Sequence, residues 1–203
     1  KFESILALPN VVGINIATRS DAISKETYDY LSVLNKRTFL TVEIGLQSMH
    51  QSTLDYINRG HTLKNFEACI KELKRRNIRV VVHIINGLPY ETKEMMVETV
   101  KYLNDLDIDG IKIHMLHIIK DTELENRYKK EKFHVLTKEE YIDIVITQLE
   151  FLNQEIIIER ITGDPVKEDL VSPTWLIKKF CVLNDIDKEM VKRNTYQGKK
   201  LEH

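Results

Sequence analysis

Strand-like and helix-like segments alternate along most of this chain, and this alternation restricts the fold more than any other feature. Apolar, β-branched runs predict strands at residues 11–17, 39–47, 78–86, 111–118 and 156–161. Helical spacing of apolar residues predicts helices at residues 24–36, 52–57, 63–77 and 92–106 and from residue 137 onward. Such alternation is typical of parallel strands joined by right-handed crossovers.

The ends of the predicted helices carry their own signals. A side-chain hydroxyl at the position before a helix can accept a hydrogen bond from a free backbone N–H group. Residues of this kind are Ser24, Thr62, Thr92 and Thr137, and the last opens a capping box with Glu140. Residues 121–133 look less regular, and residues 175–182 and 187–192 look helical.

Polar residues recur on one face of the predicted strands, although an ordinary buried parallel strand is apolar on both faces. Alternation in residues 39–47 places Glu43 and Gln47 on the face opposite the apolar side chains. His83 occupies the same kind of position in residues 78–86. Five strands are too few for a closed eight-stranded barrel. We therefore expect an α/β fold, an incomplete (β/α) barrel or open sheet of parallel strands around a polar ligand.

Bulk composition argues against several classes of protein. The 203 residues are enough for one domain with a sizeable core, and a formal net charge of -1 gives no overall basic field for nucleic acid. No apolar run reaches the roughly 18 residues of a membrane span. The two cysteines, Cys69 and Cys181, are too far apart for a metal-ligand motif or a disulfide framework. A cytoplasmic location fits this composition.

Two local features allow more than one interpretation. The basic run at residues 71–79 is either a solvated helix end, where cations are favoured, or a phosphate-binding patch. His114 and His117 suggest a metal site, but residues three apart on a strand face opposite sides, so no shared metal is expected. Alternation does not decide whether Lys112 and His114 or their neighbours lie on the polar face.

Five short motifs, taken in order, resemble the radical S-adenosylmethionine (SAM) superfamily. They are ATRSD at residues 17–21, EIGLQS at 43–48, INRGHT at 57–62, GLP with Glu91 and Thr92 at 87–92, and RITGD at 160–164. The sequence is most similar to the Elongator catalytic-subunit-like branch, and within it to a bacterial group of Fe–S oxidoreductases. The resemblance extends over most of the chain.

This resemblance implies a partial (β/α)6 barrel, with the first four predicted strands as its third to sixth and residues 156–161 as an extra element. The family binds a [4Fe–4S] cluster through a CxxxCxxC motif, which is absent here. The chain is therefore expected to be the C-terminal part of a longer enzyme. Residues 1–155 would form the partial barrel, residues 156–200 an extra strand and a helical extension, and residues 201–203 the remnant of a purification tag.

The resemblance also assigns roles to individual residues. Gln47 matches the position that hydrogen-bonds the ribose of SAM, and Arg59 matches the arginine that pairs with its methionine carboxylate. Both roles suit the side chains, since an amide donates and accepts hydrogen bonds and a guanidinium binds a carboxylate bidentately. Glu43 is expected beside the cofactor, His83 replaces an aspartate that contacts the ribose in some relatives, and Gly87 belongs to a turn beside the adenine.

The implied activity is that of a longer parent enzyme that reductively cleaves SAM and abstracts hydrogen from an unknown substrate, with tRNA as one class of candidate. This chain alone is expected to be inactive. A metal-dependent (β/α)-barrel lyase or hydrolase using Glu43, His83 and His114 is one alternative, and a non-catalytic nucleic-acid or partner-binding module using residues 71–79 is another. The first strand would be an exposed edge, which predicts a dimer.

Overall fold

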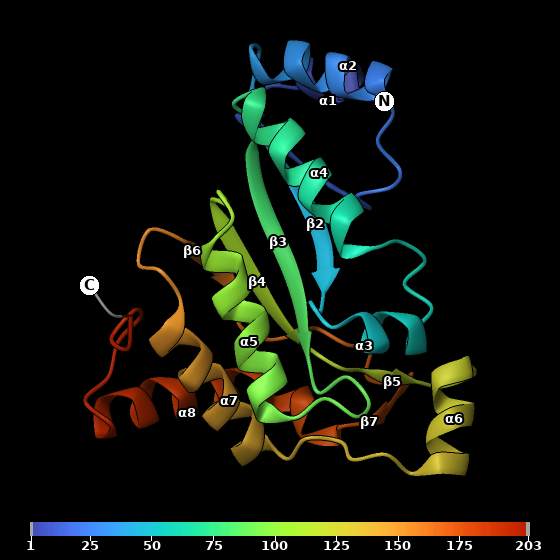
Figure 1. Ribbon diagram of the computed structural model, residues 1–203, viewed down its shortest axis with the longest axis vertical. Coiled ribbons are helices and arrows are strands. Elements are labelled where there is room, and N and C mark those ends of the chain that lie inside the picture. Colours follow the sequence, from blue (N-terminus) through green and yellow to red (C-terminus); the bar gives the residue numbers. More distant parts are fainter. Residues whose placement is uncertain (1, 202–203) are drawn as a thin grey trace.

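A computed structural model describes residues 2–201, without the side chain of Lys179 (Figure 1). Residues 202 and 203, two of the three expected to be a tag remnant, lie outside the described residues. The strands are β1 (Gly13–Thr18), β2 (Phe39–Gln47), β3 (Arg79–Asn86), β4 (Gly110–Met115), β5 (Ile118–Ile119), β6 (Ile157–Arg160) and β7 (Leu170–Ser172). The helices are α1 (Phe2–Leu6), α2 (Lys25–Asn35), α3 (Gln51–Tyr56), α4 (Leu63–Arg75), α5 (Lys93–Asn104), α6 (Glu123–Glu131), α7 (Lys138–Phe151), the 3-10 helix η1 (Thr174–Lys178) and α8 (Lys179–Lys192).

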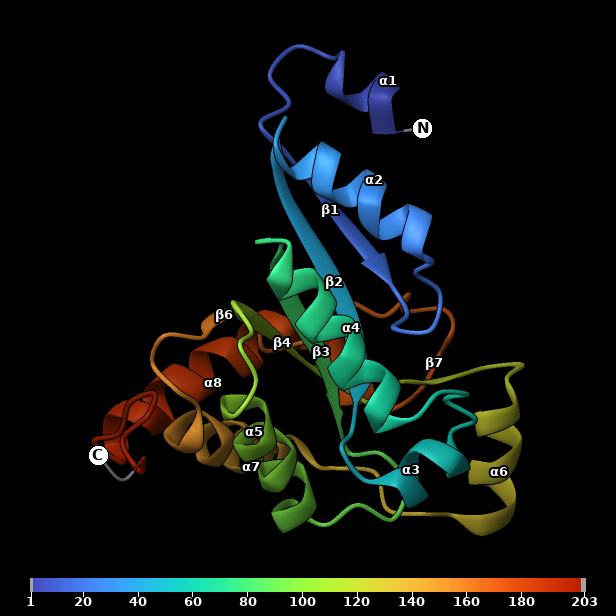
Figure 2. The ribbon, with the colours of Figure 1, turned by 45° about the horizontal axis from the view of Figure 1, so that its top comes forward.

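Five of the strands form one parallel sheet in the order β1-β2-β3-β4-β6. In the described chain the sheet does not close, because β1 and β6 are its two edges. Figure 1 shows α4 and α5 in front of the strands, and Figure 2 shows α2 in the same layer over β1. The expected α/β fold with an incomplete ring of parallel strands is confirmed, and β6 shows that the segment 156–200 contributes a strand to this sheet.

The main core lies between the sheet and these helices. Ile44 of β2 and Val82 of β3 are fully buried there, against side chains such as Phe66 of α4 and Leu103 of α5. The opposite face of the sheet, which carries Glu43, is called the inner face below. Because side chains alternate along a strand, the apolar half of each strand holds the helices and leaves the other half free to line a site.

The predicted caps are confirmed. A side-chain oxygen accepts a hydrogen bond from the backbone N–H three residues later at Ser24, Thr62, Thr92 and Thr137. The reciprocal capping box of Thr137 and Glu140 is present at the start of α7. None of the helices within residues 2–201 is long and apolar enough to cross a bilayer.

Two predictions about the middle of the chain are wrong. The fourth strand does not continue to residue 118, because β4 ends at Met115 and Ile118 pairs instead with Ser172 in the small antiparallel sheet β5-β7. Residues 121–133 are not irregular but contain α6. This helix begins at the cap Thr122 and is held by a hydrogen bond of 2.8 Å from Arg127 to the carbonyl of Tyr56, a contact that the local sequence does not reveal.

Candidate functional site

The carboxyl end of β2 brings Gln47 and Arg59 together. The pairing of β2 with β3 slips between Gly45 and Gln47, where a β-bulge gives Gln47 a φ of 71°. Arg59, in the loop after α3, donates from Nη2 to the carbonyl of Gly45 at 2.5 Å. A Cβ on Gly45 would lie 2.6 Å from Nε2 of Gln47 and 3.2 Å from Nη2 of Arg59. Both side chains therefore lie against Gly45, in space that only glycine leaves open.

This pair keeps hydrogen-bonding capacity that the described chain does not use. Oε1 of Gln47 and Nε of Arg59 are buried and have no hydrogen-bond partner among residues 2–201. Buried polar atoms without partners are rare in native proteins and cost about 1–3 kcal/mol each. Burial, together with the nearby charge of Arg19, lowers the pKa of Arg59. An unpaired acceptor beside an unpaired cationic donor fits a ligand that carries both hydroxyl and carboxylate groups.

Glu43 is the centre of a charged network on the inner face. Its carboxylate accepts hydrogen bonds from Nε2 of His83 at 2.7 Å and from Nζ of Lys112 at 2.6 Å. Burial alone would raise the pKa of Glu43, but the hydrogen bonds from Lys112 and His83 outweigh it and lower the pKa. Burial lowers the pKa of His83 in spite of Glu43. Glu43 is thus a buried carboxylate that holds a neutral histidine in place.

The strand register settles which face of β4 is polar. His83 pairs with Lys112 and Ile85 with His114, so Lys112 and His114 lie on the inner face with His83. The rings of His83 and His114 stack with centroids 5.1 Å apart. His117 follows the end of β4, with its Nε2 against Gly163. Sequence periodicity could not find Lys112 or His114 as site residues, since only the pairing with β3 fixes their side.

The metal alternative has no support in the structure. Within residues 2–201, no group of three or more histidine, cysteine, aspartate or glutamate side chains could hold a metal ion. Glu43 accepts a hydrogen bond from His83, so these two side chains are already partners of each other.

Gly87 has a backbone reason to be glycine. Its φ is 81°, and the nearest atoms to a Cβ at this position would be those of Leu136, at 3.0 Å. The turn that follows carries Glu91, whose carboxylate accepts a hydrogen bond from the hydroxyl of Ser48, directly after Gln47. Burial raises the pKa of Glu91. The hydrogen bond between Ser48 and Glu91 joins the two loops at the carboxyl ends of β2 and β3, and no local sequence pattern predicts it.

The basic run at residues 71–79 is largely neutralised. Ion pairs join four of its cations to carboxylates: Lys74 to Asp109, Arg75 to Glu72, Arg76 to Glu72 and Arg79 to Glu159. This pairing removes the basis for a phosphate-binding patch here. The run is not simply a solvated helix end either, because the side chains of Lys74, Arg76 and Arg79 are largely buried and only Arg75 is well exposed.

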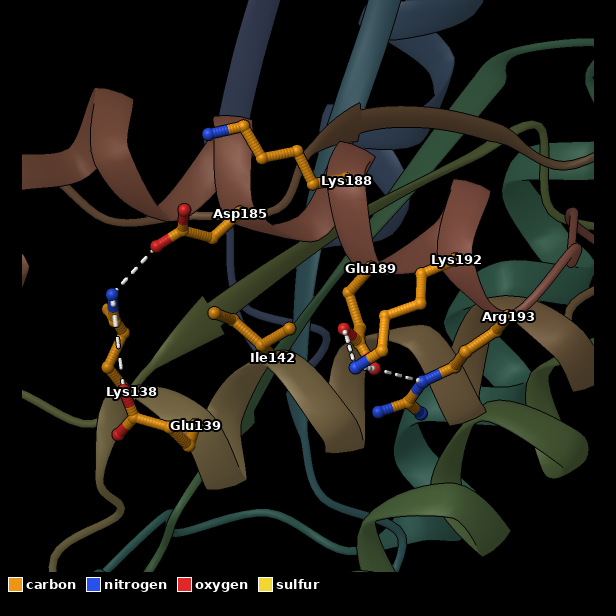
Figure 3. A pocket seen from close by; sticks show the side chains of 8 residues that line it. All are labelled: Lys138, Glu139, Ile142, Asp185, Lys188, Glu189, Lys192 and Arg193. Atoms are coloured by element: carbon orange, nitrogen blue, oxygen red, sulfur yellow. Dashed lines mark hydrogen bonds and ion pairs between the residues drawn. The ribbon is translucent and has the colours of Figure 1, made fainter.

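A separate pocket lies between α7 and α8, with a volume of about 400 Å³ (Figure 3). Its charged walls are paired as well, with Lys138 2.7 Å from Asp185 and Arg193 3.0 Å from Glu189. These residues come from the helical part of the chain and none of them belongs to the strands of the inner face. We therefore treat the inner face, and not this pocket, as the candidate functional site.

Known proteins share both the sequence and the fold. Residues 2–103 match the family model of the radical SAM superfamily, and residues 108–192 match that of the Radical_SAM C-terminal domain. The uncharacterized protein YtqA of Bacillus subtilis is 47% identical over 199 residues, covering 98% of this chain and 62% of that protein. The tRNA uridine(34) acetyltransferase of Methanocaldococcus jannaschii is 27% identical over 137 residues, covering 66% of this chain and 25% of that protein.

Among solved structures, the archaeal Elp3 of Methanocaldococcus infernus superposes with a TM-score of 0.81 at 25% identity. The match covers 92% of this chain and 43% of that one. The chain spans about three-fifths of the length of the curated relatives that match nearly all of it, 61–62% in each case.

Proposed function

This chain belongs to the radical SAM superfamily, and we propose that the full-length protein is an iron–sulfur enzyme that binds SAM over the inner face of this sheet. The family uses SAM together with a [4Fe–4S] cluster. When bound, SAM and the cluster supply radical chemistry that abstracts a hydrogen atom from the substrate. The protein's part is to bind and orient SAM and the substrate and to exclude water.

The single observation that carries the proposal is that Gln47 and Arg59, which lie against Gly45, each keep a buried polar atom without a hydrogen-bond partner in the described chain. Oε1 of Gln47 can accept a hydrogen bond from a ribose hydroxyl, and the guanidinium of Arg59 can pair with the methionine carboxylate. Glu43 and Lys112 neutralise each other beside this position, so they add polarity to its surroundings without net charge. The chemistry of these side chains fits the ribose and methionine parts of SAM.

The same residues do not fit the cluster. Of the two cysteines, Cys69 is on the buried face of α4 and Cys181 is exposed on α8, and a CxxxCxxC motif is absent. We therefore expect the cluster ligands to lie in a part of the full-length protein outside these 203 residues. This chain alone should bind no cluster and should not cleave SAM.

We propose tRNA as the first substrate class to test, because one relative is named as a tRNA uridine(34) acetyltransferase. Two free cysteines and the absence of a membrane-spanning helix in the described chain are consistent with the cytoplasm, where we expect the protein to act. A binding site for RNA at residues 71–79 is not part of this proposal, because its cations are paired.

The test is reductive cleavage of SAM by the full-length protein, reconstituted anaerobically with iron and sulfide. With a strong reductant we expect 5′-deoxyadenosine and methionine, detected by liquid chromatography and mass spectrometry. Arg59→Gln should lower the rate, whereas Arg75→Gln, which changes an exposed arginine on α4, should not. A fully reconstituted cluster without any 5′-deoxyadenosine would refute the proposal.

A further inference from the structure

One row of residues crosses the inner face from β2 to the far edge strand β6. It consists of four residues paired in register on adjacent strands: Gly45, His83, Lys112 and Arg160. Adjacent strands lie about 4.8 Å apart, so three spacings make the row roughly 14 Å long. The couple of Gln47 and Arg59 lies at the Gly45 end. The Arg160 end is therefore a separate place on the same face, within reach of a second molecule.

Arg160 carries the uncompensated charge of this row. The ammonium of Lys112 lies 2.6 Å from Glu43 and 3.6 Å from Glu159, so its charge is satisfied. The side chain of Arg160 is exposed and has no hydrogen-bond or ion-pair partner within residues 2–201. A bulge between β4 and β6 accompanies this arrangement, because Ile111 pairs with Ile158 while Lys112 pairs with Arg160, and the extra residue is Glu159.

His114, near Arg160, adds a ring nitrogen that has no hydrogen-bond partner in the described chain. Its ring stacks on His83, and its Nε2 is buried with no hydrogen-bond partner among the described residues. Burial lowers the pKa of His114 to about 4, and the neighbouring groups that add to this effect are all cationic or able to become so: His83, Arg160, His117 and Lys112. Among residues 2–201, Glu43 is already bonded to Lys112 and His83, and Glu159 is paired with Arg79 and Lys112, so neither carboxylate neutralises Arg160.

We propose that Arg160, beside the stacked His83 and His114, recognises an oxyanion of the substrate, either a carboxylate or a phosphate. The guanidinium presents parallel N–H donors that match two oxygens of such a group, and Nε2 of His114 can provide a further hydrogen bond. The placement of a substrate here, roughly 14 Å along the row from Gly45, rests on the proposed function. The capture of an anion by Arg160 does not depend on it.

This assignment explains part of the RITGD motif at residues 160–164. Arg160 ends β6 and belongs to the row, and Gly163 leaves room for the ring of His117, since a Cβ there would collide with its Nε2. The motif thus places a free guanidinium and packs the loop that follows it.

The experiment follows the histidine ring signals of this chain by nuclear magnetic resonance, with His114 assigned by His114→Gln. Inorganic phosphate and acetate are titrated separately at constant ionic strength and pH. We expect at least one of the two anions to shift the His114 and His83 signals in a saturable way. The anion that binds more tightly identifies phosphate or carboxylate as the recognised group. Arg160→Gln should weaken binding about tenfold or more, because a charge-assisted pair is lost.

Arg75→Gln is the matched control and should bind like the wild type, and Arg160→Lys should keep part of the affinity because it keeps the charge. Arg160 is exposed and unpaired, so its variants should fold, which circular dichroism verifies. Shifts caused by neither anion, or shifts equal in Arg160→Gln and wild type, would overturn the inference. If anions bind but full-length protein binds no SAM, the proposed function fails and this site stands.

Discussion

At the scale of single residues, the smallest side chain of the site decides where two larger ones lie. Gly45 leaves room for the amide of Gln47 and the guanidinium of Arg59, which would otherwise be pushed off the inner face. Glycine has no conformational need here, because position 45 is not among those with positive φ. The reason for glycine is therefore space for neighbouring side chains.

Gly45→Ala should impair ligand binding more than folding. Its Cβ would meet the far end of Gln47 at 2.6 Å, and a flexible side chain can move away at little cost to stability. We expect the full-length protein to lose about tenfold in SAM affinity, since one or two hydrogen bonds are displaced. Gly110→Ala should instead impair folding more than ligand binding, because its Cβ would meet the carbonyl of Ile157 at 3.1 Å and Val81 at 3.3 Å.

Calorimetry with SAM and thermal unfolding of both variants separate the two effects. If Gly45→Ala lowered the melting temperature as much as Gly110→Ala and left the SAM affinity intact, the steric explanation would be wrong.

Glu43 should contribute stability in a pH-dependent way. Its folded-state pKa is lowered from the ordinary value of 4.5, so its contribution is fully present above that pH and is lost as the pH falls through the folded-state pKa. Glu43→Gln removes the charge that satisfies Lys112 and should lower the free energy of unfolding by about 2 kcal/mol at pH 7. Urea denaturation should show the difference shrinking below pH 4.5, and a difference independent of pH would contradict this account.

At the scale of helices and strands, most elements could be predicted because their signals are local. β2 has the predicted bounds, and the hydroxyl caps place the starts of α2, α4, α5 and α7 correctly. The misses depend on contacts between distant segments. α6 has few apolar residues and is held by the hydrogen bond from Arg127 to the carbonyl of Tyr56. β5 forms only because β7 pairs with it.

The site was predictable only in part for the same reason. Motif resemblance pointed to Gln47 and Arg59, and the structure places them together, although their role as ligands of SAM stays a prediction. The placement of Lys112, His114 and Arg160 on the inner face follows only from the register of β3, β4 and β6, which no single-strand pattern contains. The bulge that turns Gln47 over Gly45 likewise breaks the alternation on which strand predictions depend.

A buried amide pair joins the end of β3 to α7. Asn86 and Gln148 exchange two hydrogen bonds of 2.8 Å, and Gln148 also donates to the carbonyl of Met96 in α5 at 2.9 Å. Either alanine substitution leaves the other amide buried and unsatisfied, which costs about 1–3 kcal/mol. A double-mutant cycle by urea denaturation should show coupling of about 1 kcal/mol. Strict additivity of Asn86→Ala and Gln148→Ala would show that the pair is not cooperative.

At the scale of the whole molecule, the sheet has two open edges in the described chain. β1 is one of them, and Val12, just before it, is 87% exposed. An unprotected edge strand tends to pair with another chain. We therefore predict that this chain forms dimers or larger species in sedimentation velocity, and that Val12→Lys, which adds a charge at the edge, favours the monomer. A wild-type chain that sediments as a monomer at the highest concentration reached would refute this.

The central claim is that the inner face holds SAM through Gln47 and Arg59, and its most direct measurement is the affinity of the full-length protein for SAM. Equilibrium dialysis with radiolabelled SAM, under anaerobic conditions, should compare the wild type with Arg59→Gln and with Arg75→Gln. We predict that Arg59→Gln weakens binding about tenfold or more while Arg75→Gln matches the wild type. Equal affinity of the wild type and Arg59→Gln, with both proteins folded, would contradict the claim.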